Sequence, residues 1–169
     1  MQTAIRSARR SFCARTPTIL ARQHLPANAH RLARTMSSVT THASLSPIST
    51  TNAPAAVGPY SQAIRVGDLL FVSGSLGIDP SSGKMVAGGV EAQAEQALKN
   101  TKSIIEVAGG EVGRVAKTTV FLQSMDDFKV MNGIYEKFFG GHKPARSAVQ
   151  VARLPLDGLF EIECIVSLA

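Results

Sequence analysis

An arginine and a glutamate near the C-terminal end of the chain have the side-chain chemistry that a small carboxylate substrate requires. Arg146 follows Pro144, whose ring fixes its own φ and keeps the preceding residues out of a helix, so an ordered backbone presents the guanidinium. Glu161 and Glu163 lie two positions apart, so in a strand both carboxylates project from one face, while the apolar residues between and after them line the other. A guanidinium can bind a carboxylate, and a glutamate can orient or deprotonate a water molecule.

We expect Arg146 and Glu161 to lie on neighbouring strands and to form one site. The residue types alone leave an alternative open, in which the two side chains pair with each other at the surface or simply face solvent. Exposed ion pairs are common and contribute little to stability. The surrounding elements and motifs are therefore needed to decide between these interpretations.

Alternating apolar residues and β-branched runs predict the strands that carry these side chains. The two-residue turn Gly67-Asp68 joins the first two strands as a hairpin. Ser73-Gly74 follows at the end of the second strand, where the glycine lets a ligand approach the backbone and the hydroxyl can donate to it. Tyr60, beside a stiff Gly-Pro corner, is placed to cap a pocket. The predicted strands are residues 63–66, 69–72, 115–122, 149–152 and 161–166.

Two segments have the apolar period of a helix. Residues 90–108 place their apolar side chains on one helical face and are stopped by Gly109-Gly110. The second helix begins at Ser124 or Asp126 and carries an apolar stripe that we assign to the core. Asn132 is a polar residue within that helix and is either exposed or part of a site. The stripe consists of Phe128, Met131, Ile134, Tyr135 and Phe138.

The order of these elements predicts an α+β fold, a mixed β-sheet with two helices packed on one face. The uncovered face carries Ile165 together with small or polar residues, and we expect it to be buried against other subunits. The predicted protein is therefore an oligomer.

The charge of the chain is concentrated near its N-terminus. The protein has 169 residues and a formal net charge of +6, with 18 basic and 12 acidic residues. Seven arginines lie in residues 1–50, which contain no acidic residue, so 11 basic and 12 acidic residues remain in residues 51–169. The predicted folded part is thus close to neutral, which argues against a phosphate-binding surface. No apolar run approaches the roughly 18 residues that a membrane span needs.

Residues 1–45 have the composition of a mitochondrial transit peptide, rich in Arg, Ser, Thr and Ala and without acid. We therefore expect a folded domain at residues 46–169, located in the mitochondrial matrix, with cleavage between Arg34 and Ser49. The alternative is a disordered basic arm that binds nucleic acid. Cys13 would leave with the leader, so the mature chain would keep only Cys164 and form no disulfide within one subunit.

Several kinds of catalytic site are missing from the predicted mature chain. It contains one histidine, His142, and one cysteine, so no metal site of usual composition can be built from one chain. It also lacks a dinucleotide fingerprint, a phosphate loop and a catalytic serine system, and we predict no cofactor. Hydrolysis would have to use carboxylate, arginine, hydroxyl and backbone groups, and its substrate would have to be intrinsically reactive.

A series of short motifs runs through residues 49–169, including Asn52-Ala53-Pro54, Gly58-Pro59-Tyr60-Ser61-Gln62, Ser73-Gly74, residues 117–122, Asn132, Tyr135-Glu136, Pro144-Ala145-Arg146-Ser147, residues 151–155 and Glu161-Ile162-Glu163. A dozen such motifs, in order, closely resemble the RidA (YjgF-like) family. The resemblance implies a chorismate-mutase-like subunit in a homotrimer, with clefts at the subunit interfaces. It further implies cofactor-free hydrolysis of 2-enamine and 2-imino acids, such as 2-aminoacrylate and 2-aminocrotonate, to 2-keto acids and ammonia. These intermediates leak from pyridoxal-phosphate dehydratases, so the activity would protect pyridoxal-phosphate enzymes.

The resemblance also implies roles for single residues. Arg146 would bind the substrate carboxylate through its planar fork, and Glu161 would orient or deprotonate the attacking water. Glu163 would be structural. The residues that shape the cleft and hold the imine end would be Tyr60, Ser73, the Gly74 backbone and Asn132.

This chain departs from many family members at Ala148, where they carry a cysteine after the Arg-Ser pair. Family contacts at this substrate-binding position run largely through the backbone, so we expect activity to survive. Regulation through a thiol at this position should not.

Two other functions remain open at this stage. A non-catalytic trimer that binds small carboxylates would need Arg146 but could dispense with Glu161. A ribonuclease or translation inhibitor, an activity attributed to some relatives, is disfavoured by the near-neutral folded part and by the lack of a histidine pair suited to phosphodiester cleavage. We therefore expect no nucleic acid partner and no membrane partner.

Overall fold

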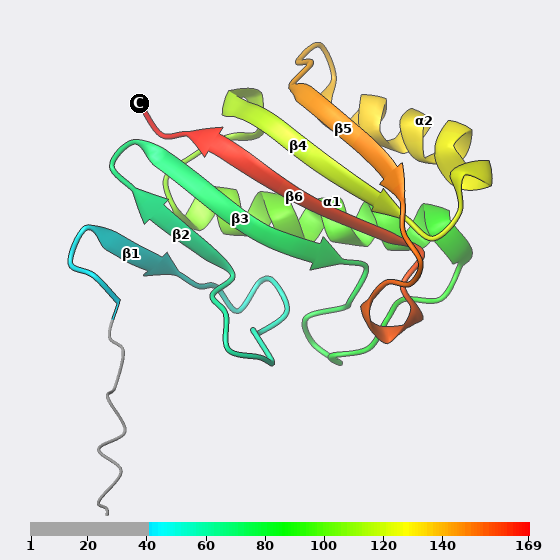
Figure 1. Ribbon diagram of the computed structural model, residues 1–169, viewed down its shortest axis with the longest axis horizontal. Coiled ribbons are helices and arrows are strands. Elements are labelled where there is room, and N and C mark those ends of the chain that lie inside the picture. The colour runs from blue at the N-terminus through cyan, green and yellow to red at the C-terminus, as the bar shows by residue number, and fades with distance from the viewer. Residues whose placement is uncertain (1–40) are drawn as a thin grey trace, which may run out of the picture. The chain divides into compact units, whose positions relative to one another are not determined.

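The computed structural model of the protein describes residues 41–169 (Figure 1). Most of the predicted leader lies outside the described residues. Residues 41–169 form two α-helices, six strands and three short 3-10 turns. In chain order the strands and helices are β1 (Leu45–Ile48), β2 (Ala63–Val66), β3 (Leu69–Leu76), α1 (Gly89–Val107), β4 (Val115–Leu122), α2 (Phe128–Phe139), β5 (Ala145–Gln150) and β6 (Phe160–Ser167).

The six strands form one sheet in the order β1-β2-β3-β6-β4-β5. All neighbouring pairs are antiparallel except β4 and β5, which are parallel. The last strand of the chain therefore lies in the middle of the sheet, between β3 and β4 (Figure 1). The prediction that Arg146 and Glu161 lie on neighbouring strands is wrong. Helix α2 carries the chain back so that β5 pairs with the outer edge of β4, and β6 then occupies the inner edge.

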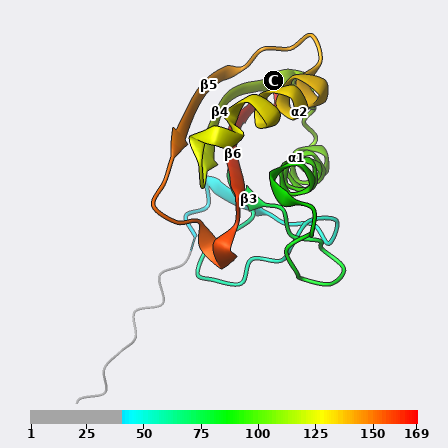
Figure 2. The same cartoon turned by 90° about the vertical axis from the view of Figure 1, so that its right-hand side faces the viewer.

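Both helices pack on the same face of the sheet, which confirms the predicted α+β arrangement (Figure 2). Strand β6 alternates buried and less buried residues along its whole length, and β4 does so from Thr118 to Leu122, after a register shift between Val115 and Lys117. Their buried side chains join one face of each helix in a single core. Members of this core that are at most 2% exposed include Leu98, Ile105, Val120, Met131 and Ile162.

Polar side chains fix α1 against the ends of the strands. The buried Asn100 amide donates to the carbonyls of Leu76 and Ile78, at 3.1 and 2.8 Å. Gln93 Oε1 accepts from the backbone N–H of Leu159 at 2.7 Å. Because unpaired buried polar groups are costly, these bonds set the position of the helix along the sheet.

Three elements differ from the prediction. Strand β1 was not expected; Pro47 lies within it, which the sheet tolerates because β1 is an edge strand. Strand β3 does not end before Ser73 but continues to Leu76 across a bulge between Val72 and Ser75. Strand β5 begins at Ala145, so Arg146 lies within the strand rather than ahead of it.

The second face of the sheet carries no helix, and we call it the open face. Val66, Leu69, Phe71 and Val149 lie on it and are 38 to 43% exposed. Within residues 41–169, no helix has the length and apolar character to span a membrane.

We expect Gly77→Ala to destabilise the fold, because a Cβ at this position would lie 2.5 Å from the Cα of Gln93 in α1. Overpacking against backbone costs about 1–3 kcal/mol. The matched control is Gly133→Ala in α2, where an added Cβ meets nothing within 4 Å and helix propensity favours alanine by about 1 kcal/mol. Urea unfolding of the two variants should move the midpoint in opposite directions. Equal stabilities would contradict the close contact between Gly77, which follows β3, and Gln93 of α1.

Candidate functional site

The structure places the predicted site residues on opposite faces of the sheet. Arg146 is in register with Thr118 of β4, which is in register with the buried Cys164 of β6, so all three side chains belong to the helix-covered face. Glu161 is in register with Phe121 and therefore belongs to the open face. Strand β4 also lies between the strands that carry Arg146 and Glu161. One chain does not bring the two side chains together.

The first group, which we call the arginine half-site, contains Arg146, Ala148 and Asn132. Ala148 lies two residues after Arg146 on the same face of β5. Asn132 lies four residues after Phe128 and three before Tyr135, so these three side chains share one side of α2. The rings of Phe128 and Tyr135 lie 5.7 and 4.6 Å from the Arg146 guanidinium carbon, which brings this side of the helix to the arginine.

A buried hydrogen bond anchors the arginine half-site to the sheet. The Tyr135 hydroxyl and the Thr118 hydroxyl are 2.7 Å apart, and the Thr118 side chain is fully buried. Burial raises the pKa of Tyr135, which outweighs the opposing effects of the Thr118 hydrogen bond and the Arg146 charge. The phenol is therefore neutral at physiological pH and serves as a hydrogen-bonding group.

The second group, which we call the glutamate half-site, contains Glu161, Gly74 and Ser73; Tyr60 is 53% exposed and lies on the segment next to Ser73 without a recorded contact to Glu161. The carboxylate of Glu161 lies against the Cα of Gly74, and a Cβ there would overlap its Oε1 atom. Ser73 Oγ donates to the carbonyl of Ser61 at 2.7 Å, which ties β3 to the segment that holds Tyr60. The bulge in β3 thus places a glycine where the carboxylate needs space.

The surroundings of Glu161 raise the pKa of its carboxyl group. Burial raises its pKa, and the neighbouring charge of Glu163 raises it further. Within residues 41–169, its side chain makes no ion pair. A carboxylate with a raised pKa and no fixed partner is suited to take a proton from water.

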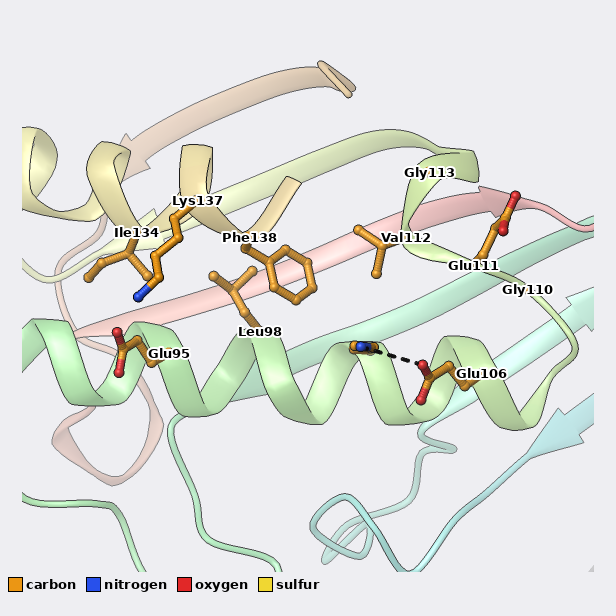
Figure 3. Close-up of a pocket in the computed structure, with 11 residues that line it drawn as sticks. Glu95, Leu98, Glu106, Gly110, Glu111, Val112, Gly113, Ile134, Lys137 and Phe138 are labelled. Carbon is orange, nitrogen blue, oxygen red and sulfur yellow. Dashed lines mark ion pairs between the residues drawn. The ribbon is translucent and has the colours of Figure 1, made fainter. Parts of the chain in front are cut away.

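Two hollows lie elsewhere on the surface. A groove of about 610 Å³ runs between α1 and α2, over Leu98, Ile134 and Phe138 (Figure 3). Charged side chains, including Lys137, surround it, and none of the predicted site residues lines it. A smaller hollow of about 460 Å³ is lined in part by Tyr60. The larger hollow is thus remote from the predicted chemistry, and we place the candidate site by its side chains instead.

The described part of the chain contains no cluster that could bind a metal ion, and its one cysteine thiol is buried. Residues 41–169 contain no cluster of three or more His, Cys, Asp or Glu side chains that could hold a metal ion. Burial raises the pKa of Cys164 to about 12, with Glu163 adding to the effect. This thiol is therefore protonated and inert at neutral pH.

Sequence reasoning missed Thr118, Tyr135 and Phe128 as parts of the site. The apolar stripe on α2 was assigned to the core, and Tyr135 does lie there. The signal that could have identified it is its hydroxyl, since a buried tyrosine needs a hydrogen-bond partner, and its spacing of three from Asn132.

Known proteins match this chain over about the same residues in sequence and in structure. The sequence profile of the family described as endoribonuclease L-PSP matches residues 50–168. A protein of Mus musculus named 2-iminobutanoate/2-iminopropanoate deaminase is 53% identical over 118 residues, covering 70% of this chain and 87% of the relative. Reactive Intermediate Deaminase A, chloroplastic, of Arabidopsis thaliana is 51% identical over 121 residues, covering 72% of this chain and 65% of the relative. The crystal structure of E. coli TdcF with bound serine is 42% identical, has a TM-score of 0.70, and is matched over 73% of this chain and 99% of that one.

We expect Glu163→Gln to lower the pKa of Glu161 toward its ordinary value of 4.5 without reaching it, because burial is the larger cause of the shift. A carbon-13 NMR titration of the side-chain carboxyls measures this directly. The folded state holds the Glu161 proton to higher pH than the unfolded chain does, so stability falls as pH rises from 4.5 through the folded-state pKa.

The control for this titration is Glu161→Gln, which should lack that loss of stability with rising pH. A pKa of Glu161 that does not respond to Glu163→Gln would show that the two carboxylates do not interact.

Proposed function

The chain belongs to the RidA/YjgF family, and from that membership and the two half-sites we propose that it is a 2-iminobutanoate/2-iminopropanoate deaminase. The reaction hydrolyses a 2-imino acid, formed from its 2-enamine tautomer, to a 2-oxo acid and ammonia. The observation that carries the proposal is Glu161, a half-buried carboxylate with a raised pKa, seated over Gly74 and without an ion-pair partner in residues 41–169. The relative from Mus musculus, 53% identical, has this activity as its name.

The chemistry requires one acid–base group and one carboxylate-binding group. Arg146 binds the substrate carboxylate through two parallel N–H donors. Glu161 takes a proton from water while the water oxygen attacks the imine carbon, and the electron pair of the C=N bond moves to nitrogen. The nitrogen then gains that proton from Glu161, which gives a tetrahedral intermediate with a hydroxyl and an amino group on the same carbon. Glu161 next takes the hydroxyl proton and passes it to the nitrogen, so the C–N bond breaks, ammonia leaves and the carbonyl forms. A raised pKa keeps Glu161 able both to accept and to return that proton.

The two half-sites become one site when two subunits meet. In the proposed homotrimer, the arginine half-site of one subunit faces the glutamate half-site of the next across an interface cleft. The exposed apolar side chains of the open face, including Leu69 and Phe71, support burial of this face between subunits. Tyr60, Ser73 and Asn132 then line the cleft and hold the imine end of the substrate.

Small amino acids suit a cleft of this kind. The serine bound to TdcF, a relative that is 42% identical, is a carboxylate of three carbons, as 2-aminoacrylate is. The leader composition supports import into the mitochondrial matrix, where the enzyme would remove such intermediates before they inactivate pyridoxal-phosphate enzymes.

Ribonuclease activity is the second candidate, because the family description carries that word. The near-neutral charge of residues 51–169 weighs against it. His142 would be the histidine available for such chemistry in the predicted mature chain, and its Nε2 is bonded to the carbonyl of Val115 at 2.7 Å. RNA cleavage that survives both Arg146→Ala and Glu161→Ala would favour this candidate.

We expect Arg146→Ala and Glu161→Ala to fail in different ways. Loss of the general base should lower kcat by about 100-fold to 10,000-fold. Loss of the guanidinium should mainly raise KM, because the carboxylate is bound in the ground state as well as in the transition state. The assay follows loss of 2-aminoacrylate and 2-aminocrotonate generated by a dehydratase, with protein from residue 46 onward.

A wild-type protein that leaves imine decay unchanged would refute the deaminase. If it still bound small carboxylates through Arg146, the non-catalytic trimer would replace it.

Mixed trimers test whether the site lies between subunits. At substrate concentrations well below the raised KM of Arg146→Ala, both Arg146→Ala and Glu161→Ala should have little activity alone, but after joint unfolding and refolding a site can combine the intact half of each. Random assembly of equal amounts should restore about a quarter of wild-type activity per site, if each interface pairs one half-site from each neighbour. The control is the same procedure with either variant alone. No recovery from mixtures that sedimentation shows to be mixed trimers would contradict the shared site.

A further inference from the structure

Two aromatic side chains of α2 hold the guanidinium of Arg146. Its Cζ atom is 4.6 Å from the ring centroid of Tyr135 and 5.7 Å from that of Phe128, both within the roughly 6 Å range of a cation–π interaction. Among residues 41–169, Arg146 makes no ion pair. The aromatic rings are therefore its main side-chain contacts, and the N–H donors stay available to a ligand.

The ring of Tyr135 is itself fixed to the sheet. Its hydroxyl bonds to Thr118 at 2.7 Å, and Thr118 is the β4 residue in register with Arg146 of β5. Tyr135 also stacks on Phe139, with ring centroids 4.4 Å apart. The hydrogen bond and the stacking leave the ring little freedom to rotate away from the arginine.

We propose that Tyr135 is a positioning residue, whose ring, anchored by Thr118, orders the Arg146 side chain before a substrate carboxylate arrives. Phe128 supplies a second aromatic contact. This inference rests on the proposed function, since it concerns the side chain that binds the carboxylate. The competing explanation is that Tyr135 only packs α2 on the sheet.

Ordering Arg146 in advance has a direct effect on affinity. A free arginine has many rotamers and must lose that freedom when it binds a ligand, which weakens binding. Contact with an aromatic ring restricts the side chain but uses no N–H donor, so the planar fork can still bind both carboxylate oxygens. Removing the ring should therefore raise KM and leave kcat nearly unchanged.

The experiment compares three variants of the oligomeric protein with 2-aminocrotonate as substrate. Tyr135→Leu removes the ring and should raise KM roughly threefold to thirtyfold, the range set by cation–π strengths. Phe128→Leu removes the more distant ring and should raise KM less; it also carries the test if Tyr135→Leu fails to fold. Phe138→Leu is the control, an aromatic of the same helix that contacts Phe139 and lines the α1–α2 groove. It should leave KM unchanged.

Two further measurements separate positioning from packing. In an Arg146→Ala background, Tyr135→Leu should have no additional effect on KM, because the side chain that it positions is gone. The Nε–H resonance of Arg146 should carry a ring-current shift in the wild type that Tyr135→Leu removes. A rise in KM that is equal with and without Arg146, or no rise at all in either ring variant, would overturn the inference.

Binding of pyruvate, measured by calorimetry, distinguishes failure of this inference from failure of the proposed function. If the wild type does not hydrolyse imines but binds pyruvate, and Tyr135→Leu weakens that binding, the proposed function fails and the positioning role stands. If the wild type hydrolyses imines but neither ring variant changes KM or pyruvate affinity, the positioning role fails alone. If the wild type neither hydrolyses imines nor binds pyruvate, both fail.

Discussion

The alternation of side chains along β4 and β6 is the constraint on which the rest of this structure depends. Because successive residues of a strand point to opposite faces, the residues that seal the core beneath α1 and α2 leave Glu161 and Glu163 on the far side. The pairing of β4 with β5 places Arg146 on the helix-covered side by the same rule. One chain thus carries two incomplete sites on opposite faces of its sheet. No rotation of the Arg146 or Glu161 side chain can bring them together, so a complete site requires a second subunit.

The two half-sites hold their key groups by different physical means. Glu161 depends on partial burial and on a neighbouring like charge, which together favour its protonated form. Its position depends on Gly74, since the bulge in β3 brings bare backbone to the carboxylate. Arg146 instead lies against two aromatic rings. Acid–base chemistry needs the first environment and recognition of an anion needs the second, and within one chain the two lie on opposite faces of the sheet.

The sequence predicted most of the elements but not their spatial order. Periodicity identified both helices and the hairpin through Gly67-Asp68, because these depend on residues close together in the chain. It could not show that β6 pairs with β3 and β4, since strand order depends on where α2 returns the chain. The same limit applies to the site. Arg146 and Glu161 stand out by residue type and motif, whereas the contact between Arg146 and Tyr135 depends on register and helix packing, which no local pattern encodes.

The position of β6 has a consequence for how the molecule forms. Its partners β3 and β4 are made long before it, and no other strand fills the space between them. A chain emerging from the ribosome can form α1 and the β2–β3 hairpin early, but its sheet remains in two pieces until β6 is available. Such long-range closure is slow and leaves strand edges unpaired for a time. The sheet is therefore completed only when β6 inserts between β3 and β4, and until then those two strand edges are open to pairing with another chain.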